Sequence, residues 1–131
     1  SVRATLICEV EGDHYIVNFN KQSMRDYYIL VHDDWYAAVN KTKKEAAKTG
    51  ENFTTILKQG QADGLYPQTP DVDNEFMKIQ EDKYLVIKNF LTDPGSEEKH
   101  KKDLEDIARR EVEYFLNTKN KELYKKLNAI D

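Results

Sequence analysis

Apolar and polar residues alternate at the start of the chain. Residues 2–10 place one apolar face at Ala4, Leu6, Cys8 and Val10. This period of two predicts a half-buried strand, and residues 14–19 repeat it as the return strand of a hairpin. The three residues between them form the predicted loop, in which Gly12 supplies the positive φ that such a loop needs. A third strand is expected at residues 27–32, after a polar loop, so the chain begins with three antiparallel strands.

The spacing of apolar residues becomes helical in the middle of the chain. The acidic pair at residues 33–34 predicts the N-cap of a helix that begins with Trp35 and closes at Gly50. Residues 52–60 predict a second helical piece, although two adjacent threonines leave a strand open there. Two glycines and two prolines in residues 60–74 predict a loop.

The last third of the chain combines an ambiguous segment with a clear helix. Residues 76–79 and 84–91 favour a hairpin, but a buried strand or a helix also fits them. After a turn at residues 92–95, Ser96 is expected to cap a long helix. Its apolar stripe comprises Leu104, Ile107, Ala108, Val112, Phe115 and Leu116, and it resumes at Leu123, Leu127 and Ile130. This stripe predicts one bent helix or a helix pair.

These elements predict one α+β domain over residues 1–131, with about five strands, a central helical segment and a long C-terminal helix or helix pair. The chain begins at Ser1 rather than at a methionine, which favours an excised fragment or a processed mature chain. The longest apolar run, residues 27–31, is far shorter than the roughly 20 residues of a membrane span. We therefore expect a soluble protein with no transmembrane segment.

Composition narrows the function classes. The formal net charge of −4 argues against broad non-specific binding of nucleic acid. The single cysteine, Cys8, excludes an internal disulfide and slightly favours an intracellular protein. Asn40 and Asn52 open glycosylation sequons, so a secreted or surface-exposed protein also fits. The five glycines lack the spacing of a phosphate-binding loop, and no cofactor is expected.

Two small groups of residues could carry chemistry. His32, with the acids at residues 33–34, could belong to a metal-dependent hydrolase, although a strand end followed by a helix N-cap explains the same tripeptide. Cys8 and His14 could form a thiol nucleophile and its base. In the expected register, Val10 faces His14, so Cys8 and His14 share a face at roughly 7–8 Å. A small hydrolase or thiol enzyme is therefore one hypothesis, with packing as the simpler explanation of both groups.

Aromatic residues are more informative. The chain has eight tyrosines and one tryptophan, and five of these nine fall in residues 15–36. Because both residue types are enriched in binding surfaces, we expect a non-enzymatic protein-binding module. Its predicted binding residues are Tyr28, Trp35, Tyr36, Lys41 and Lys44. The alternative is a nucleic-acid-binding module in which tyrosines stack on bases and the lysines contact phosphate. The identity of the partner and the homo-oligomeric state stay open.

Overall fold

The computed structural model describes residues 5–93, 95 and 97–130. The α+β class is confirmed, whereas the expected number of about five strands is wrong, because three strands and six helices make up the described residues. In chain order they are β1 (Thr5–Val10), β2 (Asp13–Asn18), α1 (Gln22–Val31), α2 (Asp33–Thr49), α3 (Phe53–Ala62), α4 (Asn74–Thr92), α5 (Glu97–Leu116), α6 (Lys121–Asn128) and β3 (Ala129–Ile130). The predicted cap at Ser96 lies outside the described residues.

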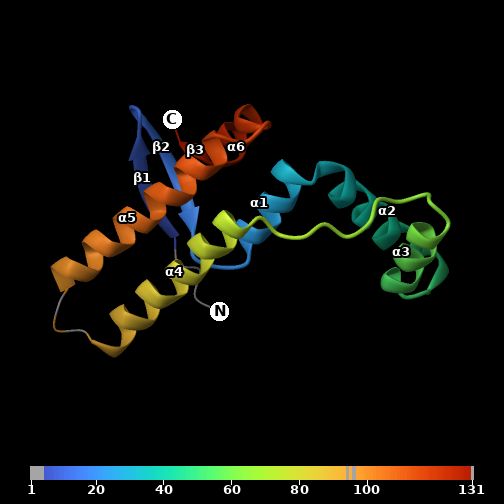
Figure 1. Cartoon of the computed structure of the whole chain (residues 1–131), viewed down its shortest axis with the longest axis horizontal. Helices are drawn as coiled ribbons and strands as arrows, with labels where there is room; N and C mark the ends of the chain where they lie inside the picture. Colours follow the sequence, from blue (N-terminus) through green and yellow to red (C-terminus); the bar gives the residue numbers. More distant parts are fainter. Residues whose placement is uncertain (1–4, 94, 96, 131) are drawn as a thin grey trace.

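The three strands form an antiparallel sheet in the order β1-β2-β3, and helix α5 packs against it (Figure 1). The hairpin was predicted correctly, but its loop was not. Glu11 and Gly12 both have positive φ, at 53° and 85°, and they form a two-residue turn. Two positive φ values match the twist of the flanking strands. The turn is one residue shorter than expected, so Val10 pairs with Asp13 rather than with His14.

Residues 27–32 were predicted as a strand, and this prediction is wrong because residues up to Val31 belong to helix α1. The buried side chains of α1 are Ser23, Asp26, Tyr27 and Leu30, which recur every three to four residues. Two of these four are polar, so the helical period does not appear in a pattern of apolar residues. The apolar run itself reads equally well as a buried strand or as part of a helix.

The hairpin expected over residues 76–91 is also wrong, because helix α4 runs through the whole segment. Its buried residues are Phe76, Ile79 and Lys83, and the lysine interrupts the apolar period that would have marked a helix. Residues 53–62 form helix α3, as expected, with the Asn52 side chain accepting a hydrogen bond from the Thr54 amide at 2.8 Å.

The C-terminal part of the chain forms two helices, α5 and α6. This is the helix pair that the apolar stripe predicted as the alternative to one bent helix. Ile107, Ala108, Val112 and Phe115 are buried, as predicted. The continuation of the stripe was wrong, because Leu123, Leu127 and Ile130 lie at the surface while Tyr124 and Asn128 of α6 face the interior. Aromatic rings link these helices to the sheet: the Phe115 and Tyr124 centroids lie 4.8 Å apart, and those of Tyr124 and Tyr15 lie 5.7 Å apart.

Helices α2 and α3 form an arm, residues 33–62, that projects from the body beyond α1 (Figure 1). Residues 63–73 then return along the molecule to the start of α4. Tyr66 from this return segment packs on Gly60, where an added Cβ would come within 2.1 Å of the tyrosine ring. Among the described helices, none has the length and apolar character needed to cross a bilayer.

Candidate functional site

Three of the predicted binding residues lie at the junction where α1 meets α2. The rings of Tyr28 and Trp35 pack together with their centroids 4.9 Å apart, and both residues are half-buried, as is Tyr36. The Trp35 Nε1 atom is buried without a hydrogen-bond partner within the described part of the chain. The structure therefore brings Tyr28 and Trp35 into contact beside Tyr36, although a helix pair rather than a strand and a helix positions them.

The two predicted lysines are exposed on α2 but do not share the face of Tyr36. Lys41 and Lys44 follow Tyr36 by five and eight residues, which rotates them by about 140° and 80° around the helix. The Lys41 Nζ atom lies 5.9 Å from the ring centroid of Tyr66. Lys43, between them in sequence, lies over Phe53 at 5.5 Å. Lys41 and Lys44 thus lie about 60° apart on one face of α2, and this face is turned about 80–140° away from Tyr36.

The side chains of residues 32–34 do not point towards a common site. The Nε2 atom of His32 lies 3.1 Å from the hydroxyl of Tyr27, which also accepts a hydrogen bond from the Asp73 amide at 2.8 Å. Asp33 points elsewhere and bonds to the Lys119 ammonium at 3.1 Å. This bond lowers the pKa of the Asp33 carboxyl. His32 and Asp33 thus have separate partners. No group of three or more metal-ligating side chains that could hold an ion occurs within the described residues.

Cys8 and His14 do not form a catalytic pair. The observed register pairs Cys8 with Tyr15 and Glu9 with His14, so His14 lies on the opposite face of the hairpin from Cys8. The expected shared face is therefore wrong, because the shorter turn shifts the register by one residue. Cys8 is only 7% exposed, and burial raises the pKa of its thiol. A protonated, buried thiol is a poor nucleophile.

A polar cluster inside the fold was not predicted from the sequence. The Lys83 ammonium donates to Glu111 Oε1 at 2.8 Å, to Ser23 Oγ at 2.9 Å and to the backbone carbonyl of Asn18. Gln80 donates to the same Glu111 oxygen at 2.7 Å. Lys83 and Glu111 are 4% and 2% exposed. The cluster ties β2 and α1 to α4 and α5. Its one sequence signal is that Lys83 and Glu111 occupy core-facing helical positions.

Ser23 and Lys83 are as close as a nucleophile and its general base would be, but Lys83 cannot accept a proton from Ser23. An ammonium has three protons and no acceptor, and all three protons of Lys83 are used in the cluster. Desolvation lowers the pKa of Lys83, and the adjoining carboxylate of Glu111 opposes this shift. Burial likewise raises the pKa of the neighbouring Asp26, which accepts from Gln22 at 2.9 Å. The cluster therefore acts as an internal tie between elements.

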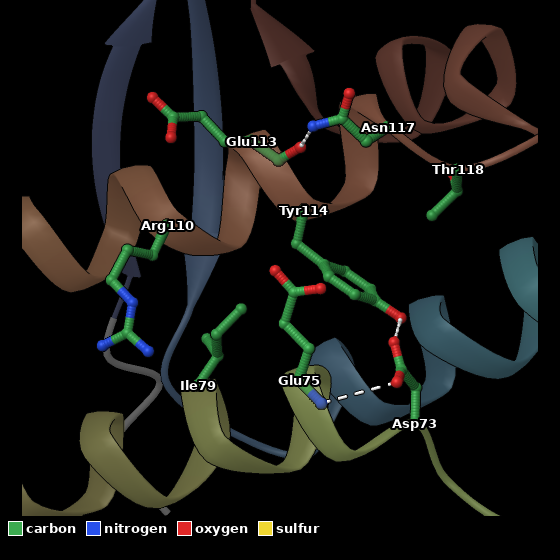
Figure 2. Close-up of a pocket in the computed structure, with 8 residues that line it drawn as sticks. All are labelled: Asp73, Glu75, Ile79, Arg110, Glu113, Tyr114, Asn117 and Thr118. Atoms are coloured by element: carbon green, nitrogen blue, oxygen red, sulfur yellow. Dashed lines mark hydrogen bonds between the residues drawn. The ribbon is translucent and has the colours of Figure 1, made fainter.

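An open pocket of about 440 Å³ lies between the start of α4 and the end of α5 (Figure 2). Tyr114 donates to Asp73 Oδ2 at 2.7 Å, and Asp73 also caps α4 through the Glu75 amide at 3.4 Å. Burial, and then this bond to Asp73, raise the pKa of Tyr114, so its hydroxyl stays protonated. The one guanidinium in the lining, that of Arg110, bonds to Asp82 at 2.8 Å. The lining of the pocket therefore offers three carboxylates, the carboxamide of Asn117 and a protonated tyrosine hydroxyl.

Comparisons of the chain with protein-family models, with curated proteins and with solved structures find no match. Its function must therefore be inferred from its own residues.

Proposed function

We propose that this protein is a non-enzymatic protein-binding module that contacts its partner through the junction of α1 and α2. The observation that carries the proposal is the partly exposed pair Tyr28 and Trp35, with Tyr36 beside it, at the base of a projecting arm. Large aromatic side chains on a rigid scaffold bury much area on binding and lose little conformational freedom.

The internal pairing of the reactive groups supports binding over catalysis. His32 bonds to Tyr27, Asp33 to Lys119, and Lys83 to Glu111, while Cys8 is buried. A catalytic base or nucleophile must instead be free to reach a substrate. The alternative of a small hydrolase or thiol enzyme therefore has less support than a binding module.

The nucleic-acid alternative rests on Lys41 and Lys44. Affinity for phosphate comes from several cations that track one backbone together. On α2, the two lysines share a face that is turned about 80–140° from Tyr36, so base stacking on Tyr36 and phosphate contact by the lysines would fall on different faces of the helix. The chain also has a net charge of −4. Both features favour a protein partner over a nucleic acid.

Substituting Tyr36→Ala should weaken capture of the protein partner about fivefold or more, which corresponds to about 1 kcal/mol. The reason is the loss of aromatic area at the contact. The measurement is affinity capture from nuclease-treated lysate, with the captured protein identified by mass spectrometry and its affinity then determined with purified components.

The matched control is Phe53→Ala, which removes an aromatic ring that is 38% exposed on the same arm, and it should leave capture unchanged. Both variants should melt close to the parent protein. Equal capture by Tyr36→Ala and the parent, or loss of the captured partner after nuclease treatment, would contradict the proposal. Unfolding of Tyr36→Ala would assign the aromatic junction to the core instead.

A further inference from the structure

Two carboxylates are buried in the interior of the fold, and they share one ammonium unequally. Asp26 and Glu111 are 5% and 2% exposed. Glu111 is paired with the Lys83 ammonium at 2.8 Å and also accepts hydrogen bonds from Gln80 at 2.7 Å and from Ser23 at 3.0 Å. Within the described part of the chain, no salt bridge includes Asp26. Asp26 is therefore a buried acid without a cation of its own.

The hydrogen bonds of Asp26 come from uncharged amides. Gln22, one turn earlier in α1, donates to one carboxyl oxygen at 2.9 Å. Asn128, at the end of α6, donates to the other oxygen at the longer distance of 3.4 Å. Two neutral donors offset only part of the cost of removing a carboxylate from water. Burial therefore raises the pKa of Asp26, although both amide bonds oppose this shift.

The titratable groups around Asp26 belong to three other helices. Lys83 of α4 favours the ionised carboxyl and lowers its pKa, whereas the carboxylate of Glu111 in α5 raises it. Tyr124 of α6 faces the same region, and burial raises the pKa of its hydroxyl, which stays protonated. Since Glu111 already holds the ammonium of Lys83, Asp26 is the member of this group that takes up a proton most readily.

Helix α6 is attached to α1 by a side chain at each of its ends. Asn120, just before α6, donates to the Leu30 carbonyl at 2.7 Å, and Asn128, in the last turn, donates to Asp26. The strand β3 that follows has two residues and pairs with His14 and Tyr15 of β2. An element held by few bonds opens at a lower free energy than the core of a fold.

We propose that Asp26 and Asn128 form a pH-sensitive latch between α1 and the end of α6, which is closed while Asp26 is protonated and opens more often once Asp26 is ionised. The protonated carboxyl donates to the side-chain oxygen of Asn128, so no charge is buried. After ionisation, opening of the last turn of α6 lets water reach the carboxylate and removes the cost of its burial. The latch does not rest on the proposed function, because it uses none of the residues of the aromatic junction.

The direction of the pH dependence follows from proton binding. In the open state, Asp26 meets water and has the ordinary pKa of an aspartate, about 4. In the closed state, burial raises this pKa. Between the two pKa values, the closed state binds more protons than the open state. The stability of the closed latch is therefore complete below about pH 4 and is lost as the pH rises through the raised pKa.

The first test is hydrogen exchange of the backbone amides of residues 125–128, at about pH 4 and about pH 7, with the rates corrected for intrinsic exchange. At the higher pH, Asp26→Asn should protect these amides several-fold better than the parent, and at the lower pH the two should agree. This comparison isolates Asp26, because every other acid titrates in both proteins. The matched control is Asp71→Asn, which removes an exposed carboxylate from the return segment and should follow the parent at both pH values.

Two results of this experiment would overturn the latch. One is an Asp26→Asn variant whose amides exchange like those of the parent at both pH values. The other is a parent protein in which residues 125–128 are protected as strongly as the buried part of α5 at about pH 7, because α6 would then open only when the whole fold unfolds.

The second test is Asn128→Asp, which places another carboxyl group beside Asp26. In acid the two groups share a proton, and at higher pH they repel one another. The variant should fold at about pH 4, and by about pH 7 its last turn of α6 should lose about tenfold more protection than the same turn of the parent. A pH profile like that of the parent would contradict the contact between Asp26 and Asn128 on which the latch depends.

Discussion

Replacing Glu111 with alanine should lower the free energy of unfolding by about 3–5 kcal/mol. The substitution leaves the Lys83 ammonium 4% exposed and without its carboxylate, and a buried charge with no partner is among the most costly defects in a fold. Urea unfolding followed by circular dichroism measures the loss. A domain of this size has about 5–15 kcal/mol in total, so the loss would be a large fraction of its stability.

The double variant Lys83→Met with Glu111→Leu separates the cost of an unpaired charge from the value of the pair. Apolar residues of similar volume remove the unpaired charge, so this variant should recover most of the lost stability. The exposed pair of Asp33 and Lys119, with side chains 59% and 64% exposed, serves as the control. Asp33→Ala should cost less than about 1 kcal/mol. Two results would contradict the argument that the unpaired charge of Lys83 causes the loss. One is a Glu111→Ala variant that is as stable as the parent, and the other is a double variant that is as unstable as Glu111→Ala.

Phe115→Ala should also lower the free energy of unfolding by about 3–5 kcal/mol. Phe115 is 0% exposed, and its ring centroid lies 5.4 Å from that of Phe76 and 4.8 Å from that of Tyr124. Removing the ring would leave a cavity where α4, α5 and α6 meet, and the rigid neighbours could fill it only in part. Urea unfolding and thermal melting would measure the same loss independently.

Leu127→Ala is the matched control, because the apolar stripe read from the sequence includes both residues. Leu127 is 48% exposed in the fold, so its truncation should change stability by less than about 0.5 kcal/mol. A cost for Leu127 equal to that for Phe115 would show that α6 turns a different face to the core.

For the hairpin, both strands were predicted correctly but the register between them was wrong. Alternation over β1 and β2 identified both strands, but the loop was assigned one residue too many because Glu11 is not a residue type expected at positive φ. That single residue moves His14 to the face opposite Cys8. The apparent thiol and base pair disappears with it.

Helix α1 was missed and helix α4 was only an alternative to a hairpin, and both have the same reason. Each turns a polar side chain to the interior, at Ser23 and Asp26 in α1 and at Lys83 in α4. These residues are buried because partners 28 to 102 positions away in the chain satisfy their hydrogen bonds. A local pattern of apolar residues contains no information on such distant partners.

The residues of the aromatic junction were predicted from the sequence, but the pair of helices that positions them was not. Composition pointed to Tyr28, Trp35 and Tyr36, and the contact between Tyr28 and Trp35 follows from the turn at His32 between two helices. The exposure of Met77, Tyr84 and Leu91 on α4 could not be foreseen, because a hairpin was the first expectation for the same residues.

The dependence of partner affinity on salt tests most directly whether this protein binds another protein through the aromatic junction. Between about 50 and 200 mM salt, the affinity should fall by less than about tenfold, and the pair Lys41→Glu with Lys44→Glu should leave it nearly unchanged. Tyr36→Ala should lower it at both salt concentrations. A fall of about 1,000-fold or more over the same range, together with abolition by the lysine pair, would contradict the account and assign the binding to phosphate contacts.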